Sequence, residues 1–257
     1  MKQENIGTLT DLHCHILPGV DDGAADRGEA RALLDAQASQ GVGQILFTPH
    51  FYAERMTPED FLRNREEAAR QMEEDWGALG ITGALGAEVR MEQQLLDLEL
   101  KPLALGQTGY LLLEWPFSAT YPLWGGDVVR RVYDSGNRPV FAHVERYEFF
   151  FREPERLAPF LAEGALCQMN AATLLRESTH KQALKLIRDG YVHILSSDAH
   201  SMEHRPPRLA EAFRVVASRL GEKTAQRLLR NADDIFNGRQ VTGEPPSAHR
   251  RRFLWFG

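Results

Sequence analysis

The segment Thr10-Asp11-Leu12-His13-Cys14-His15-Ile16, near the N-terminus, is the most informative part of this chain. Its apolar character predicts a β-strand, in which successive side chains point to opposite faces. His13 and His15 therefore share one face. The same alternation in Leu195-Ser196-Ser197-Asp198-Ala199-His200 pairs a carboxylate with an imidazole. Two such pairs from opposite ends of the chain predict a metal site with several ions, and through it a hydrolase.

The composition is that of an ordinary soluble globular protein. The 257 residues are 43% hydrophobic and 26% charged, enough to bury a full core. The net charge of −6 argues against a nucleic-acid partner. No apolar run approaches the ~18–20 residues of a membrane span, and the first residues lack the apolar segment of a secretory signal. Two cysteines, Cys14 and Cys167, make no disulfide framework, so we expect a cytoplasmic protein.

Apolar runs and helical patterns alternate along the chain. Seven runs predict strands, at Leu9–His13, Gln44–Thr48, Ile81–Glu88, Gly109–Glu114, Arg138–His143, Leu166–Asn170 and Val192–Ser196. Helices are predicted between and after them, at Arg27–Gln40, from Thr57 to Leu79, and at Asp127–Ser135, Glu153–Glu163, Thr179–Asp189, Pro207–Leu220 and Lys223–Arg230. This alternation predicts a parallel α/β sheet. A closed barrel fits better than an open sheet, because barrel strands bring their C-terminal ends to one mouth.

Residues that bind metals recur at these strand ends. The candidates are five imidazoles and four carboxylates, namely His13, His15, Asp22, His50, Glu88, Glu114, His143, Asp198 and His200. Each residue alone has an ordinary structural explanation, but nine at the ends of six strands indicate a shared site. The set is too large for one ion and suits two or three. Donors without thiolate favour manganese, iron, zinc or magnesium.

The other histidines and both cysteines are assigned to structure. His180, His193, His204 and His249 lie outside the strand-end pattern, and Cys14 must point away from its flanking imidazoles. A cysteine-dependent phosphatase loop needs Cys-x5-Arg, but Val20 and Thr173 occupy the arginine positions. Neither cysteine is therefore expected to act as a nucleophile.

Taken together, these motifs resemble the polymerase and histidinol phosphatase (PHP) superfamily. Within it they are similar to the manganese-dependent bacterial protein-tyrosine phosphatases encoded with capsule and exopolysaccharide genes. The resemblance runs from about Thr10 to the C-terminus. It rests on the segments His13–Gly23, Thr48–His50, Gly86–Arg90, Leu113–Glu114, Pro139–Arg146 and Ser197–His200.

The resemblance implies a distorted (β/α)7 TIM-like barrel with a trinuclear manganese site built from the nine candidates. It also implies two arginines at the substrate phosphate, matching Arg146 and Arg205. Guanidinium groups suit that role because they bind phosphate oxygens bidentately. Asp198 or His200 could protonate the phenolate leaving group; the sequence does not decide between them.

The implied substrate is a phosphotyrosine protein, namely a membrane tyrosine autokinase that regulates capsule synthesis. Two alternatives stay open: another PHP phosphoesterase, such as a histidinol-phosphate phosphatase, or a metal-binding module without activity. The sequence does not fix the oligomeric state.

The chain divides into one predicted PHP-type domain, residues 1–241, and a tail, residues 242–257. The tail begins with the proline-containing stretch Thr242–Ala248 and ends in the basic and aromatic run His249–Gly257. Such a run could contact anionic lipid or the membrane kinase. It could equally pack on the domain or on a neighbouring subunit.

Overall fold

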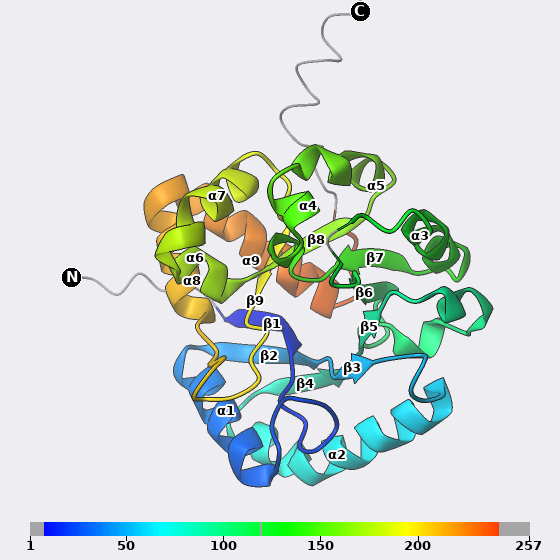
Figure 1. The fold of residues 1–257 in the computed structure, drawn as a ribbon. Helices are drawn as coiled ribbons and strands as arrows, with labels where there is room; N and C mark the ends of the chain where they lie inside the picture. The colour runs from blue at the N-terminus through cyan, green and yellow to red at the C-terminus, as the bar shows by residue number, and fades with distance from the viewer. Residues whose placement is uncertain (1–7, 119, 242–257) are drawn as a thin grey trace, which may run out of the picture.

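The computed structural model describes residues 8–118 and 120–241, in which parallel strands gather at the centre and helices surround them (Figure 1). The strands are β1 (Leu9–Cys14), β2 (Val42–Phe47), β3 (His50–Phe51), β4 (Thr82–Leu85), β5 (Glu88–Arg90), β6 (Tyr110–Glu114), β7 (Arg138–Phe141), β8 (Leu166–Asn170) and β9 (Ile194–Ser196). The α-helices are α1 (Arg27–Ser39), α2 (Pro58–Ala78), α3 (Gly125–Asp134), α4 (Glu148–Phe151), α5 (Ala158–Ala162), α6 (Ala171–Leu175), α7 (Glu177–Arg188), α8 (Leu209–Leu220) and α9 (Glu222–Phe236). Short 3₁₀ segments are η1 (Gln93–Asp97), η2 (Lys101–Leu103), η3 (Val144–Arg146) and η4 (Pro154–Leu157).

Every strand pair is parallel, in two sheets of order β1-β2-β4 and β3-β5-β6-β7-β8-β9. The hydrogen-bond ladder between β2 and β4 continues, past the break between the sheets, into the ladder between β3 and β5. The Gly86 N–H donates to the Phe47 carbonyl at 2.8 Å, and the Glu88 N–H donates to that of Pro49 at 3.1 Å. The two sheets therefore act as one curled parallel layer.

The last strand returns to the first. The Asp198 N–H donates to the His13 carbonyl at 2.9 Å, and the His15 N–H donates to the Ala199 carbonyl at 2.8 Å. Cys14 and Ala199 form a parallel bridge beside these bonds. The two ends of the chain thereby supply neighbouring strand ends, which is what the Asp-x-His and His-x-His motifs required.

The prediction of an α/β parallel sheet is confirmed, whereas the strand segments differ from those predicted. The described residues hold nine segments, because one predicted strand is interrupted and a short strand, β3, was not predicted. The predicted strand 44–48 corresponds to β2, and beyond Pro49, which has no N–H for the ladder, the short strand β3 begins at His50. The predicted strand 81–88 ends early as β4, and Glu88 begins β5.

The α2 helix begins as its sequence predicts. The Thr57 hydroxyl accepts the N–H of Asp60 at 3.2 Å, and Pro58 occupies the first turn. Phe61, Met72 and Trp76 are buried on its inner face. Tryptophan 76 stacks on Phe47 of β2, with ring centroids 4.7 Å apart. The apolar stripe thus fixes the helix against the sheet.

Other helices depart from the predicted bounds. The predicted helix 153–163 forms two shorter elements, η4 and α5. Pro159 lies in the first turn of α5, where a proline is tolerated, and not inside one continuous helix. The α9 helix runs to Phe236, beyond the predicted end at Arg230, because Ala232 and Ile235 pack with strand residues in a second core cluster. The short helices α4 and α6 were not predicted.

Two predictions concern residues outside the described range. The tail 242–257, with its proposed lipid or kinase contact, and the N-terminal residues 1–7 both lie there. Among the described helices, none combines the length and the hydropathy needed to cross a membrane.

Candidate metal centre

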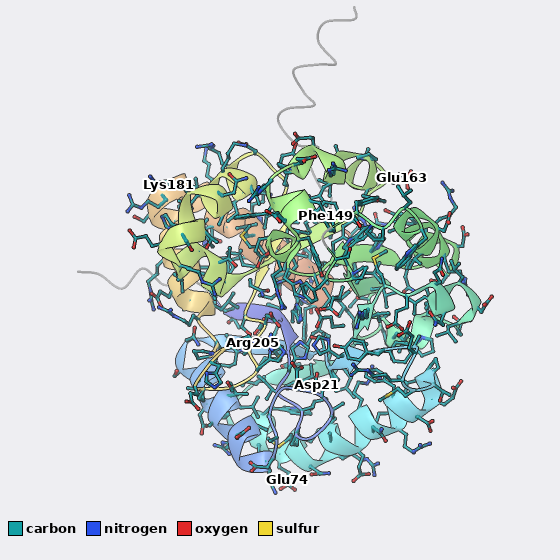
Figure 2. The ribbon with its side chains drawn as sticks, in the orientation of Figure 1. Asp21, Glu74, Phe149, Glu163, Lys181 and Arg205 are labelled. Carbon is teal, nitrogen blue, oxygen red and sulfur yellow. The ribbon has the colours of Figure 1, made fainter. Side chains whose placement is uncertain are left out.

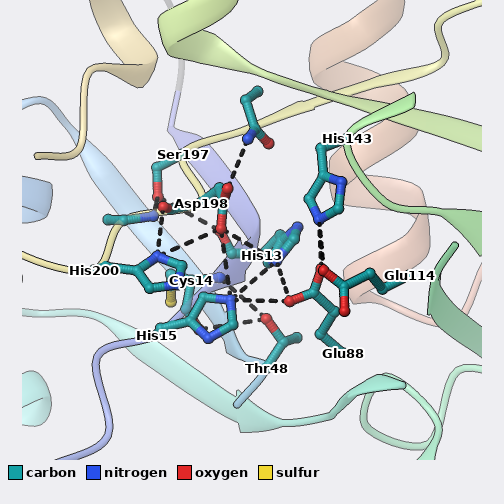
Figure 3. A network of polar contacts seen from close by, with 12 residues as sticks. His13, Cys14, His15, Thr48, Glu88, Glu114, His143, Ser197, Asp198 and His200 are labelled. Atoms are coloured by element: carbon teal, nitrogen blue, oxygen red, sulfur yellow. Dashed lines mark hydrogen bonds and ion pairs between the residues drawn. The ribbon is translucent and has the colours of Figure 1, made fainter. Parts of the chain in front are cut away.

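Strand ends and the loop after β1 bring all nine predicted ligands to one cluster. Figure 3 shows His13, His15, Glu88, Glu114, His143, Asp198 and His200. His13 lies in β1 and His15 just after it, His50 and Glu88 begin β3 and β5, and Glu114 ends β6. His143 follows β7, Asp198 and His200 follow β9, and Asp22 comes from the loop after β1. Eight of these side chains are buried or nearly so, whereas Asp22 is 61% exposed. The cluster therefore has one open side, where Asp22 lies.

Glu88 is the centre of the cluster. Its Oε2 atom lies 3.2 Å from Nε2 of His13, 3.2 Å from Nε2 of His15 and 2.9 Å from Nδ1 of His50. Its Oε1 atom lies 2.7 Å from Nε2 of His143. One carboxylate therefore faces four of the five imidazoles, which suits a bridge between ions.

Asp198 joins the strand-end residues of β1 to those that follow β9. Its Oδ1 atom lies 3.5 Å from Nε2 of both His13 and His15 and from Nδ1 of His200. Its Oδ2 atom accepts the Nδ2–H of Asn170 at 2.6 Å. One carboxylate oxygen is thus aimed into the cluster while the other is held by an amide.

Three overlapping groups have donor atoms close enough to share a cation. Within each, the donor atoms lie within 4.8 Å of one another: His15-Asp22-His50-His200, His13-His15-Glu88 and His50-Glu88-Glu114. Because His15, His50 and Glu88 each belong to two groups, the groups form a connected series. Such sharing is what a site for two or three neighbouring ions needs.

The donor atoms fit cations better than they fit each other. Oε2 of Glu88, Oδ1 of Asp198 and Nε2 of His200 are buried and make no hydrogen bond among the described residues, although other donor atoms face them. Nitrogen and oxygen ligands lie about 2.0–2.2 Å from a bound ion, so ligands at right angles are about 3 Å apart. The separations around Glu88 match that spacing, and buried unpaired polar atoms would otherwise be costly.

Backbone strain marks the same cluster. Among the described non-glycine residues, His143 and Asp198 alone have positive φ angles, of 29° and 52°. Side chains other than glycine adopt this region at an energetic cost and usually where function requires it. The strain turns both side chains toward the cluster at the points where β7 and β9 end.

The mutual electrostatics of the cluster are strong. Burial alone would raise the pKa of Glu88, yet the facing His13, His50 and His143 hold it well below its ordinary value. Burial and the neighbouring Glu88 raise the pKa of Glu114 to about 7. Burial lowers the pKa of His50, but Glu88 and Asp22 outweigh it and raise that pKa to about 11. Buried carboxylates whose pKa values depend so strongly on their neighbours indicate a site that is suited to binding cations.

Sequence reasoning missed the residues that hold the cluster in place. Asp21 accepts a hydrogen bond from the His15 ring at 2.6 Å, although only its neighbour Asp22 was predicted as functional. Gln168 of β8 contacts Nδ1 of His13 at 3.1 Å and accepts the N–H of His143 at 2.7 Å. The buried Asp11 accepts hydrogen bonds from the backbone N–H and the hydroxyl of Ser197, just before Asp198. The only sequence signal for Asp21 and Asp11 was their position beside the predicted ligands.

Gly23 is required by close approach to the cluster. A Cβ atom at this position would lie 2.0 Å from the carbonyl oxygen and 2.6 Å from the Cβ of His15. The N–H of Gly23 donates to Oδ1 of Asp21 at 2.9 Å. The Asp21-Asp22-Gly23 loop therefore closes directly onto the backbone of His15.

Arg146 and Arg205, the two arginines singled out in the sequence, border the open side. Nη1 of Arg146 and Nη1 of Arg205 lie 3.7 Å and 3.6 Å from Oδ2 of Asp198, and Arg205 also contacts Asp22 at 3.3 Å. Their side chains are 39% and 40% exposed, so both guanidinium groups reach solvent. In Figure 2, Arg205 and Asp21 lie near the middle of the view, whereas Glu74, Glu163 and Lys181 lie at its edge.

An exposed aromatic side chain, which the sequence did not indicate, supports one of these arginines. The Arg146 guanidinium lies over the Phe117 ring, 4.5 Å from its centroid. Phe117 in turn stacks on Tyr147 at 5.3 Å and on His143 at 5.9 Å. Although 54% exposed, Phe117 is thus a wall between the cluster and solvent.

The cysteines and the remaining described histidines stay outside the cluster's chemistry. Cys14 and Cys167 are buried and free, and burial raises the pKa of both thiols, so neither forms a thiolate nucleophile. The buried His193 accepts the N–H of Cys167 at 3.2 Å. His180 contacts the Leu174 carbonyl, and His204 is exposed. His249 lies outside the described residues.

The fold is a parallel α/β layer, and its strand ends gather imidazoles and carboxylates. This combination is typical of metal-dependent hydrolases. The family model described as capsular polysaccharide synthesis, CpsB/CapC, matches residues 9–237. The chain therefore belongs to the CpsB/CapC family.

Two curated relatives span nearly the whole chain. The tyrosine-protein phosphatase YwqE of Bacillus subtilis (strain 168) is 28% identical over 260 residues, covering 96% of this chain and 99% of its own. The putative tyrosine-protein phosphatase CapC of Staphylococcus aureus is 27% identical over 262 residues, covering 97% and 99%.

A solved structure confirms the fold. It comes from work on YwqE of Bacillus subtilis and CpsB of Streptococcus pneumoniae, described as unique metal-dependent tyrosine phosphatases. The TM-score is 0.83 at 25% identity, and the match covers 93% of this chain and 98% of that one.

Proposed function

We propose that this chain is a metal-dependent protein-tyrosine phosphatase. The observation that carries the proposal is the convergence of nine imidazole and carboxylate side chains on one buried cluster beside two exposed arginines. Relatives of nearly equal length are named tyrosine-protein phosphatases, and one related structure is described as metal-dependent.

The proposed metal ligands are the nine residues predicted from the sequence. They are His13, His15, Asp22, His50, Glu88, Glu114, His143, Asp198 and His200. We propose two or three manganese ions, because the donors are nitrogen and oxygen without thiolate and the groups overlap. Iron, zinc and magnesium accept the same donors and are the alternatives to test.

The chemistry supplied by bound divalent ions is the activation of water, whose pKa they lower toward roughly 7. The chain's own contribution is charge and position. Arg146 and Arg205 bind the phosphate oxygens from the open side, and their fixed forks orient the phosphorus toward the cluster. Asp198 and His200 are the two candidates for the residue that protonates the phenolate oxygen as it leaves.

The proposed substrate is a phosphotyrosine protein, namely a membrane tyrosine kinase of capsule synthesis. Family membership in capsular polysaccharide synthesis supports this choice. The two buried free cysteines suit the reducing cytoplasm, where we place the enzyme. We retain the division into a domain, residues 1–241, and a tail, residues 242–257. Contact of the tail with the kinase or anionic lipid, and packing on the domain or on a neighbouring subunit, are the alternatives to test.

We also propose that the curled sheet is a distorted (β/α)7 barrel. If β2 with β3 and β4 with β5 are counted as two interrupted strands, seven strand positions follow in chain order. The hydrogen bonds between the segment after β9 and β1 support closure of the ring.

The decisive experiment measures phosphate release from a phosphotyrosine peptide and, in parallel, from histidinol phosphate. We expect preference for the peptide, loss of activity with a chelator, and recovery on adding manganese. Preference for histidinol phosphate would assign another PHP activity, and no hydrolysis of either would favour a non-catalytic module. Activity that persists after complete metal removal would contradict the metal mechanism.

A further inference from the structure

A cavity extends from the edge of the metal cluster. Its volume is about 560 Å³, and Asp198 and Ser197 belong to its lining. Four arginines line it as well, Arg146, Arg176, Arg205 and Arg208. We call this cavity the Arg176 pocket. Because Arg146 and Arg205 border both the cluster and the pocket, a ligand at the cluster would extend naturally into it.

The charge of the Arg176 pocket is opposite to that of the protein. The chain carries a net charge of −6, yet four guanidinium groups and a single carboxylate, that of Asp198, line this cavity. The sequence shows no such concentration, because the arginines come from η3, from the end of α6 and from the segment before α8. Such a patch raises the local concentration of anions.

Three of the four arginines already have acidic partners. Arg146 and Arg205 face Asp198, and Arg205 also faces Asp22. Arg208 is held by Glu211 through Nε and Nη2, at 2.9 Å and 2.7 Å. Their charges are therefore partly balanced within the chain.

Arg176 is different. Its side chain is exposed and makes no hydrogen bond or ion pair with any residue in the two ranges that the structure describes. It lies between α6 and α7, at the position that caps α7, so its backbone is fixed while its guanidinium is free. An exposed cation on the wall of a cavity, with neighbours that are already paired, is available to an incoming anion.

The floor of the pocket leads from Arg176 to the cluster. Asn170 and Thr173, which belong to the lining, are buried, and Asn170 donates to Oδ2 of Asp198. Ala172 and Leu175 add small apolar surface between these polar groups. A peptide side chain could thus lie across this floor with its end at Arg176, while the neighbouring phosphotyrosine occupies the cluster.

We propose that the Arg176 pocket binds an anionic side chain that flanks the phosphotyrosine in the substrate protein. The anion is a carboxylate of Asp or Glu, or a second phosphate, because both accept hydrogen bonds from a guanidinium fork. The proposal rests on the proposed function and deepens it, since it makes the enzyme selective for phosphotyrosines in acidic sequences.

The test measures binding to the metal-loaded protein by fluorescence anisotropy. Labelled peptides contain a non-hydrolysable phosphonate analogue of phosphotyrosine, flanked by glutamine, by glutamate or by a second phosphonate residue. The two anionic peptides should bind roughly fivefold more tightly than the glutamine peptide, the size of a well-formed exposed ion pair. A gain with the second phosphonate alone would assign the pocket to phosphate rather than carboxylate.

Substitutions then assign the effect to the pocket. Arg176→Ala should remove the preference and leave binding of the glutamine peptide unchanged, and Arg176→Glu should favour a peptide flanked by lysine. Arg214→Ala, an exposed arginine of α8 outside the pocket lining, is the control and should keep the preference. Equal wild-type binding of all three peptides, or a preference that survives Arg176→Ala, would overturn the proposal.

Failure of the proposed function would look different. A protein that does not hydrolyse any phosphotyrosine peptide, yet binds the anionic analogues more tightly through Arg176, refutes the phosphatase activity and keeps the pocket. A protein that hydrolyses phosphotyrosine peptides with no regard to flanking charge keeps the activity and refutes the pocket.

Discussion

Asp21 holds two metal-site residues with one carboxylate oxygen. Its Oδ2 atom lies 2.6 Å from Nδ1 of His15 and accepts the backbone N–H of His50 at 2.9 Å. The bond to His15 leaves Nε2 of that ring facing Glu88. Burial alone would lower the pKa of His15, but Asp21 outweighs it and raises that pKa to about 9. A carboxylate behind a ligating imidazole fixes its tautomer and its orientation.

Asp21→Asn should weaken metal binding without removing a ligand. Loss of such a partner typically costs 10- to 100-fold in metal affinity, so we expect a manganese titration to shift by about that factor. Asp97→Asn, an exposed position in η1, is the control and should titrate as the wild type. An Asp21→Asn protein with unchanged affinity would show that the His15 ring is held by packing alone.

Arg146→Ala and Arg205→Ala should separate phosphate binding from metal binding. Each removes a guanidinium 3.6–3.7 Å from Oδ2 of Asp198 and leaves all nine proposed ligands in the chain. We expect kcat/KM to fall by roughly 100-fold, the effect of losing one preorganised donor, while metal analysis shows the wild-type content. Arg146→Lys should recover little, because an ammonium cannot bind two oxygens in one plane. Wild-type activity in either alanine variant would remove that arginine from the mechanism.

Phe117→Ala tests whether the aromatic wall positions Arg146. The cation–π contact at 4.5 Å is worth about 0.5–1 kcal/mol at an exposed site. We therefore expect KM to rise about two- to fivefold, and the melting temperature to change little because the ring is exposed. Phe117→Tyr keeps an aromatic face and should behave as the wild type. An equal rise in KM in both variants would indicate that the exact shape of the phenylalanine ring matters, and not the cation–π contact with Arg146.

The sequence predicted the cluster because two simple periodicities control it. Alternation along a strand pairs His13 with His15, and parallel strands bring distant ends such as Glu88 and His143 to one place. Both rules depend only on the order of residues along the chain. The structure accordingly places all nine predicted residues together.

The supporting residues could not be predicted in the same way. Asp21 and Asp22 are adjacent in a loop, and only the tertiary structure shows which of them turns toward His15. Phe117 and Arg176 gain their roles from neighbours far away in sequence, such as Arg146. The short α6 helix spans five residues, too few for a helical repeat to become visible.

Gly23→Ala and Gly77→Ala should change stability in opposite directions. An added Cβ at position 23 meets the His15 backbone at 2.0 Å, so the loop or the strand must move at a cost of about 1–3 kcal/mol. At position 77, near the end of α2, nothing lies within 4 Å, and alanine should stabilise the helix by up to about 1 kcal/mol. Urea unfolding of the metal-free variants measures both effects. A stable Gly23→Ala protein with normal metal affinity would show that the Asp21-Asp22-Gly23 loop yields without disturbing the site.

His193 should make the protein less stable in acid. Burial, with the charges of Arg227 and Arg138, lowers the pKa of His193 to about 3, whereas an unfolded histidine titrates near 6.5. Between these values the unfolded chain binds a proton that the folded one refuses, so stability falls as the pH drops below about 6.5. The slope for one proton is about 1.4 kcal/mol per pH unit.

His193→Asn should reduce this slope by one proton while its Oδ1 can still accept the N–H of Cys167. Urea midpoints of the metal-free protein, measured from pH 7.5 to 4.5, give the comparison. His204→Asn, at a histidine that is 81% exposed, is the control and should follow the wild-type curve. Parallel curves for the wild type and His193→Asn would mean that the folded protein takes up the proton at His193, which requires the β8–β9 region to open in mild acid.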